Sequence, residues 1–346
     1  MKIDILKNTG TTSYLTGVKI SRGMIMKKII TAMLIASLTA GLFALPNLLK
    51  KEEFGANAID ALSIDLSSEE LQIKETYDTT SIEVEIYCNY KKHAPDVSVS
   101  GSTLYIESVR KGLSFFQDPT GLTCTVIVYV PQKKDFDEIS IEASSGNIDL
   151  ERPLSAKKEI KITTSSGEIT SDGGLFADSI KISASSGDIE LLNVDADELK
   201  VNTSSGDIFI KKFTGGTGSL HSTSGDIKIN NFASEYADFN STSGVISIKK
   251  LDCDYFDAKN TSGGVSIELE SAPAATSSIE CTSGDVDLYL PMRAKFSVDV
   301  SCSSGTFRDK FNNNRMNPRD NYKMDYNGGG STIKVRTTSG NITLEY

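Results

Sequence analysis

Carboxylate side chains form the first pattern in this sequence that could support chemistry. An acidic residue follows a glycine in four successive segments, at Glu168, Asp188, Asp207 and Asp226, and again at Asp285. If those segments stack as strands ~5 Å apart, the like charges repel unless something offsets them. We expect each carboxylate to accept backbone N–H bonds at its own turn. A cation held by Asp188, Asp207 and Asp226 is the alternative, although the G-G-x-G-x-D nonapeptide of calcium-binding β-rolls is missing.

Other groups give little support to catalysis. The two histidines, His93 and His221, have no recurring acidic or nucleophilic neighbour and are expected on the surface. No serine lies in a G-x-S-x-G elbow, and no phosphate-binding loop is present. Asp252, Asp254 and Asp257 could form the carboxylate cluster of a polysaccharide-cleaving enzyme, but an acidic loop is the simpler interpretation. We therefore expect no enzymatic activity and no cofactor.

The five cysteines form no recognisable metal or redox motif. Their number is odd and no C-x-x-C pair occurs, which excludes a zinc knuckle. Cys281 and Cys302 both stand three residues before a glycine, in a column of small residues, and we expect them to fill a cramped inner corner. A disulfide between adjacent turns would be strained, because the strand spacing exceeds the ~3.8 Å that bridged Cβ atoms prefer.

The elements that must position these residues are copies of one repeat. Apolar and polar residues alternate on both sides of a Ser/Thr-Ser-Gly corner, which is the period of a β-strand. Self-similarity near 20 residues is typical of solenoids, whose units bury their apolar faces by stacking. We expect the corner to need the permissive dihedrals of glycine. The structural glycines are Gly146, Gly167, Gly187, Gly206, Gly225, Gly244, Gly263, Gly284, Gly305 and Gly340.

The repeat predicts an all-β fold, a single parallel β-solenoid (β-helix) of ~20-residue turns. An antiparallel sandwich is the alternative. Residues 59–135 are expected to form irregular first turns that cover one end, and residues 136–346 the regular repeat. The stretch 306–331 breaks the period and is expected to be an inserted loop, either a cap or a binding loop.

The N-terminal segment is expected to engage a membrane. Residues 1–25 show little pattern and are expected to be an over-extended start or a disordered tail. Lys27 and Lys28 precede an apolar run from Ile29 to Leu45 or Leu49, so residues 26–51 fit an apolar helix that is either a signal peptide or a transmembrane anchor. Both alternatives place the solenoid outside the cytoplasm, at the cell surface, in the periplasm or secreted.

Charge limits the partners of the chain. The net charge of −10 argues against a nucleic acid or an anionic lipid bound through a basic surface. Membrane contact is therefore expected only through the N-terminal apolar segment.

The repeat carries a family resemblance. The motif Ser185-Ser186-Gly187-Asp188-Ile189, its spacing, and an N-terminal part ending in Tyr129-Val130-Pro131 resemble the bacterial putative-adhesin domain family over about Ile59 to Tyr346. The resemblance implies a β-solenoid of largely undefined activity. Val245 and Gly264 depart from the pattern because they replace the acidic residue after the glycine.

Variable connections opposite the glycine corner are expected to form the binding edge, since loops vary without disturbing the ladder. Aromatic residues there would supply contact area to a sugar or a protein. We predict a non-enzymatic, extracytoplasmic, adhesin-like β-solenoid that binds a protein, a glycan or an envelope component. The alternatives are a carbohydrate-active enzyme on a β-helix fold and a membrane-anchored accessory protein in envelope-stress sensing. The candidate binding residues are Phe213, Phe232, Tyr236, Tyr255 and Tyr322.

Overall fold

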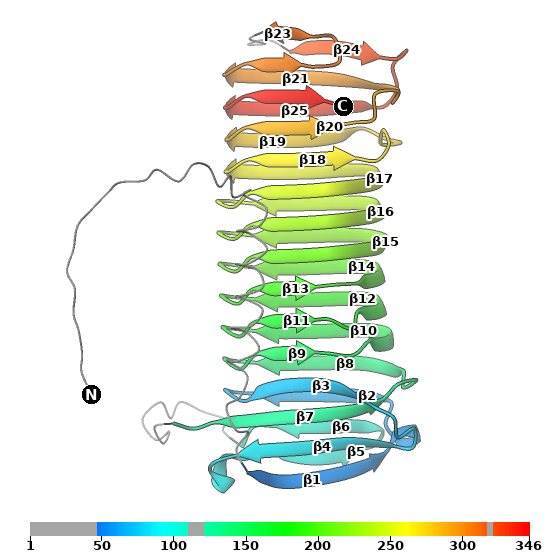
Figure 1. Cartoon of the computed structure of the whole chain (residues 1–346), viewed down its shortest axis with the longest axis vertical. Coiled ribbons are helices and arrows are strands. Elements are labelled where there is room, and N and C mark those ends of the chain that lie inside the picture. The colour runs from blue at the N-terminus through cyan, green and yellow to red at the C-terminus, as the bar shows by residue number, and fades with distance from the viewer. Residues whose placement is uncertain (1–46, 110–120, 317–320) are drawn as a thin grey trace, which may run out of the picture. The chain divides into compact units, whose positions relative to one another are not determined.

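The computed structural model describes residues 47–109, 121–316 and 321–346, in which stacked β-strands form a rod (Figure 1). Twenty-six strands of these ranges belong to one sheet, and two short 3-10 turns, η1 (Ala56–Ala58) and η2 (Lys91–His93), interrupt them. The predicted all-β fold is confirmed. None of the described segments is a helix of the length and apolarity that crossing a bilayer requires.

The strands in chain order are β1 (Leu48–Gly55), β2 (Ala61–Leu66), β3 (Glu70–Thr76), β4 (Ser81–Cys88), β5 (Asp96–Ser100), β6 (Thr103–Glu107), β7 (Cys124–Pro131), β8 (Phe136–Ala143), β9 (Ile148–Leu150), β10 (Leu154–Thr164), β11 (Ile169–Ser171), β12 (Leu175–Ala184), β13 (Ile189–Leu191), β14 (Val194–Thr203), β15 (Ile208–Ser222), β16 (Ile227–Ser241), β17 (Ile246–Ser262), β18 (Val265–Leu269), β19 (Ser277–Ser283), β20 (Val286–Tyr289), β21 (Phe296–Ser304), β22 (Phe307–Asp309), β23 (Asn314–Met316), β24 (Tyr322–Tyr326), β25 (Thr332–Ser339) and β26 (Ile342–Glu345).

The regular coils stack in parallel register from β8 to β20. Ile189, for example, pairs with Ile169 in the preceding coil and with Ile208 in the following one. Because side chains alternate between the two faces of a strand, this register aligns like residues in columns that point into the core. The parallel pairing excludes an antiparallel sandwich for this part of the chain.

In β15, β16 and β17 the connection opposite the glycine corner is itself a paired strand. Phe213 pairs with Phe232, and Phe232 pairs with Leu251. The expectation that these connections are variable loops is therefore wrong for three coils, because their backbone groups bond to the neighbouring coils.

Both ends of the rod stack out of sequence order. β2 lies between β6 and β8, and β3 between β7 and β9. At the other end β25 lies between β19 and β21, and β26 between β20 and β22. The corner of Gly340 therefore stacks between those of Gly284 and Gly305 and not beyond Gly305, as chain order predicts.

Antiparallel strands cover both ends. β4 runs antiparallel to β7 and β1, and β5 to β6. β24 and β23 run antiparallel to β21 and β22. The strands β23 and β24, which lie within the stretch 306–331, pair with the last coil and so protect strand edges that would otherwise be open.

The predicted N-terminal apolar helix is not supported where it can be compared with the structure. Residues 1–25 and most of 26–51 lie outside the described residues. The described end of that segment is the start of β1, which pairs antiparallel with β4. Lys50 and Lys51 form ion pairs with Glu52 and Glu83, so the basic end of the expected helix belongs to the rod.

Bulky and small side chains alternate in the core where the rod contains phenylalanines. The rings of Phe213 and Phe232 are 0% and 1% exposed, with centroids 4.6 Å apart. A Cβ atom on Gly218 would lie 2.3 Å from the ring of Phe232. Gly218 and Ala237, its partner in the next coil, therefore leave the space that the rings occupy.

Most of the corner glycines are needed because the neighbouring coil leaves no room for a Cβ atom, and not because their φ is positive. Of the ten, only Gly263, Gly305 and Gly340 have a positive φ. A Cβ atom on Gly225 would lie 1.9 Å from the carbonyl oxygen of Gly206, one coil earlier. The expectation that the corner needs the dihedral freedom of glycine is therefore wrong for most of the column.

Candidate functional site

The acidic column at the glycine corner has a structural role. Oδ1 of Asp188 accepts a hydrogen bond from the backbone N–H of Asp207 at 2.8 Å, and Asp207 and Asp226 accept in the same way from the next coil. Each carboxylate thus bonds to the following coil and not, as expected, to its own turn. Lys228 pairs with Asp226 at 2.8 Å, and that bond, with the N–H of Val245, lowers the pKa of Asp226.

Removal of divalent cations is expected to leave the melting temperature unchanged. Backbone N–H groups and Lys228 already offset the acidic column, and the described residues include no group of three or more His, Cys, Asp or Glu side chains that could hold a metal. A cation bound only by the native state would stabilise it by mass action. Thermal melts with and without EDTA test this. A large fall in Tm that calcium reverses would restore the cation alternative at Asp188, Asp207 and Asp226.

The five cysteines are buried, and Cys88, Cys253, Cys281 and Cys302 are free thiols. Cys281 and Cys302 donate to the carbonyl oxygens of Gly263 and Gly340, at 3.3 and 3.1 Å. Burial raises the pKa of both thiols. They fill the inner corner, as their column predicts, and their protonated form suits that packing role.

A stacked tyrosine pair lies on the surface of β16 and β17. Tyr236 pairs in register with Tyr255, and the rings stack with centroids 4.6 Å apart at an angle of 24°. Tyr255 is 42% exposed and Tyr236 is half-buried. Burial, together with Asp238 and Asp257, raises the pKa of Tyr236 to about 12. Its hydroxyl therefore stays protonated at neutral pH and can donate a hydrogen bond.

A shallow concavity of about 290 Å³ lies at the corner of β15, β16 and β17 that precedes this pair in sequence. Small residues such as Gly215 and Ala233 line it, together with Glu235 and Asp254. Glu235 and Asp254 directly precede Tyr236 and Tyr255 in sequence, although the two tyrosines do not line the concavity themselves. We call the two tyrosines, these two carboxylates and the concavity the tyrosine site.

Polar side chains extend the tyrosine site across the outer face. Tyr236 Oη lies 3.5 Å from Asp257 Oδ2, and His221 Nε2 lies 2.8 Å from Asp238 Oδ2. Ser219 Oγ lies 3.2 Å from the same Nε2 atom. A Ser-His-Asp triad needs the serine and the aspartate on opposite ring nitrogens. This group therefore lacks the geometry of a nucleophilic triad.

The five aromatic residues predicted for binding do not lie together. The prediction is wrong for Phe213 and Phe232, because paired strands and not loops hold them in the core. Tyr322 lies half-buried in the C-terminal cap, where its ring packs 5.6 Å from that of Phe307. Tyr236 and Tyr255 are brought together on the surface.

The concavities are the feature that sequence reasoning missed. A second one, of about 300 Å³, follows the same corner over β10, β12 and β14, with Lys157, Asp178, Asp195 and Asp197 among its lining residues. The signal that could have revealed the corner is a set of small residues spaced 19 positions apart: Ala177, Ala196 and Gly215 pair from coil to coil, and so do Ser234 and Cys253.

The predicted carboxylate cluster is divided between two surfaces. Asp252 and Asp254 line the first concavity. Asp257 lies on the outer face, where it accepts a hydrogen bond from Ser278. The three carboxylates therefore do not converge on one point.

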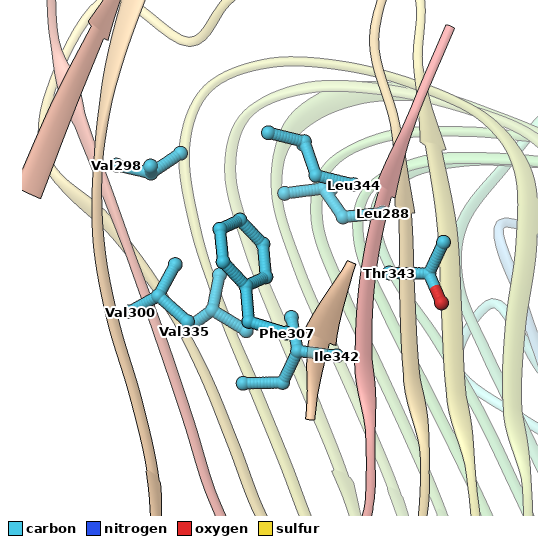
Figure 2. Close-up of a pocket in the computed structure, with 8 residues that line it drawn as sticks. All are labelled: Leu288, Val298, Val300, Phe307, Val335, Ile342, Thr343 and Leu344. Atoms are coloured by element: carbon cyan, nitrogen blue, oxygen red, sulfur yellow. The ribbon is translucent and has the colours of Figure 1, made fainter. Parts of the chain in front are cut away.

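A further gap lies inside the C-terminal end of the rod. Figure 2 shows the side chains of Phe307, Val298 and Leu344 directed toward it from different strands. The lining is apolar apart from Thr343, and the gap is too small to admit a water molecule. We assign it to core packing beneath the cap.

Comparison with known proteins identifies similar chains. The family model described as Toastrack DUF4097 matches residues 59–231 and 173–345. A putative adhesin from Parabacteroides distasonis is 12% identical, with a TM-score of 0.46, over 86% of this chain and 97% of that one. A putative adhesin from Parabacteroides merdae is 15% identical, with a TM-score of 0.44, over 86% and 95%. A putative lipid binding protein from Parabacteroides distasonis is 16% identical, with a TM-score of 0.40, over 85% and 96%. No curated protein matches the sequence.

Proposed function

The chain belongs to the Toastrack DUF4097 family, and from that premise we propose that it is a non-enzymatic, extracytoplasmic, adhesin-like β-solenoid. In this role the rod binds a protein, a glycan or another component of the cell envelope. Fold does not fix function, so the proposal depends on a surface of the rod.

The tyrosine site is the observation that carries the proposal. Its two rings occupy a column that holds Glu198 and Thr217 in the preceding coils, so the solenoid itself does not require aromatic residues there. Lysine–glutamate pairs occupy the outer face of earlier coils instead, as in the pair of Lys181 with Glu159. An aromatic pair that the ladder does not require, with the Tyr255 ring 42% exposed, favours a binding surface.

The chemistry of the tyrosine site suits a ligand with hydroxyl or amino groups. The carboxylates of Glu235 and Asp254 can accept hydrogen bonds, and the hydroxyl of the exposed Tyr255 can donate one. Ring surfaces next to hydrogen-bonding groups are what sugar rings and protein side chains both use.

Replacing both tyrosines by alanine is expected to weaken binding at least tenfold, because aromatic anchors contribute ~2 kcal/mol or more at such sites. The measurement compares binding of labelled Y236A/Y255A and wild-type protein to isolated envelope material and to immobilised glycans. The matched control is E198A/T217A, which removes side chains from the same column in the two preceding coils. Equal binding by wild type and the tyrosine variant, with equal Tm values, would rule out this site.

A carbohydrate-active enzyme is the second candidate, and the second concavity favours it. Three aspartates and Lys157 line that concavity, which are the residue types such an enzyme needs. The side chain of Lys157 is 72% exposed and forms an ion pair with Asp137 at 2.7 Å. Because Asp137 does not line the concavity, Lys157 is not directed only toward the three aspartates that do. Assays for new reducing ends on a panel of polysaccharides, with D195N as control, distinguish the two candidates.

A further inference from the structure

Exposed apolar side chains gather at the N-terminal end of the rod. Among the described residues, six of the ten large apolar side chains with high exposure lie between residues 48 and 109. The regular coils from β8 to β17 contribute only Val245 and Tyr255. The six are Leu48, Leu49, Tyr77, Tyr90, Val99 and Val109.

Three of the six meet at one corner of the N-terminal cap. Leu48 pairs with Tyr87 near the end of β4, and Tyr90 follows three residues later. The register shifts between Leu48 and Lys50, which leaves Leu49 outside the ladder and 38% exposed. In Figure 1 the start of β1 and the end of β4 lie on the same side of the rod.

Two lysines complete this corner. Lys91 and Lys92 are exposed in η2, directly after Tyr90, and neither forms an ion pair within the described part of the chain. The Tyr90 ring packs edge-on against His93 at 6.2 Å, which holds it beside the lysines. Exposed leucines, a tyrosine and unpaired lysines are the composition of a surface at the membrane–water interface. We call Leu48, Leu49, Tyr90, Lys91 and Lys92 the cap corner.

We infer that the cap corner rests on the anionic surface of a lipid bilayer. The sequence enters this corner directly after the apolar run from Ile29 to Leu45. An extended chain spans at most ~3.6 Å per residue, so three residues after that run cannot carry Leu48 far from a bilayer that holds it. The net charge of −10 does not oppose this contact, because charges further away than ~10 Å are largely screened.

A lipid surface explains the cap corner better than a second copy of the chain. A second copy would bury the leucines, but it would leave the lysines beside another acidic molecule without a specific partner. Anionic headgroups pair with the lysines while the leucines and Tyr90 enter the interface. The inference rests on the extracytoplasmic location in the proposed function and on the anchor alternative for residues 26–51, in which the apolar run stays in the bilayer.

The sequence contains no tryptophan, so one introduced tryptophan reports membrane contact without background. The experiment uses the full chain with Y90W, reconstituted in vesicles of phosphatidylcholine and phosphatidylglycerol that carry brominated acyl chains. The matched control is Y77W, because Tyr77 is 94% exposed in the same cap but precedes the start of β4, a strand that spans ~25 Å. We expect quenching of the Y90W variant to be at least twofold stronger than that of the Y77W variant.

Charge reversal tests the electrostatic part. Adding K91E and K92E to Y90W is expected to reduce the ratio of docked to undocked protein by at least ~25-fold on anionic vesicles, at about fivefold for each positive charge lost and more for the repulsion of the new carboxylates, and to change nothing on neutral vesicles. Equal quenching of the Y90W and Y77W variants, or no quenching of either, would overturn the inference. The inference would also be overturned if the tryptophan of the Y90W variant became inaccessible to solvent only when the protein dimerises in detergent. That result would assign the corner to a second copy of the chain. Because quenching needs no ligand, failure here is distinct from failure of the tyrosine site.

Discussion

Replacing Ile208 by aspartate is expected to unfold the middle of the rod. Ile208 is 0% exposed and pairs with Ile189 and Ile227, which are buried as well. The substitution removes an aliphatic side chain from a packed column and buries a carboxylate without a partner. Together these effects should cost at least ~4 kcal/mol, which is a large part of the stability of a typical domain.

Thermal and urea melts followed by circular dichroism measure the loss, and hydrogen exchange should localise it to β13, β15 and β16, because coils contact only their neighbours. The matched control is K212D, on the exposed side of the same strand. Burial in an apolar column raises the pKa of a carboxyl group, so the folded I208D variant favours the protonated form. Its stability should therefore rise as the pH falls from ~7 to ~5. A wild-type melting curve for I208D would mean that this column is not packed as described.

The strand register could be predicted from the sequence because every coil places its inward-facing residues at the same distance from the corner glycine. Ile189, Ile208 and Ile227 stand two residues after their glycines, and parallel stacking converts that spacing into one buried column. The order of coils at the ends could not be predicted in the same way. Identical corners can stack on one another in any order, so the repeat alone does not place Gly340 between Gly284 and Gly305.

The candidate site was predicted only in part because the alternation of inward and outward side chains shifts by one residue at a corner. Ile208 and Ile210 point inward, and continued alternation would direct residues 212 and 214 to the core. The chain instead turns at Lys211-Lys212, which shifts the parity and buries Phe213. Tyr236 and Tyr255 lie one period apart beyond this turn, so their stacking follows from the repeat, whereas the neighbouring concavity depends on the shape of the corner.

Replacing Gly225 by alanine is expected to force two coils apart. The added Cβ atom would lie 1.9 Å from the carbonyl oxygen of Gly206, and a backbone atom cannot rotate away. Separation of the coils would stretch two hydrogen bonds between them, from Asp226 N–H to Asp207 Oδ1 at 2.8 Å and from Ser224 N–H to the carbonyl oxygen of Ser204 at 2.9 Å. Overpacking together with weakened hydrogen bonds should cost ~3 kcal/mol or more. Urea denaturation of the G225A variant measures this cost.

The matched control lies in the corner of a later coil, at the position that directly follows the corner glycine. Gly264 has no positive φ, and the nearest atom to its added Cβ would be the carbonyl oxygen of Asp285 at 3.4 Å, an ordinary contact. G264A should therefore be neutral or should stabilise the protein by ~0.5 kcal/mol, because alanine restricts the unfolded chain more than glycine does. Both variants make the same chemical change, so the difference between them isolates the contact between coils. Equal destabilisation by both would instead mean that the corner needs the dihedral freedom of glycine, which is the explanation that the sequence alone suggested.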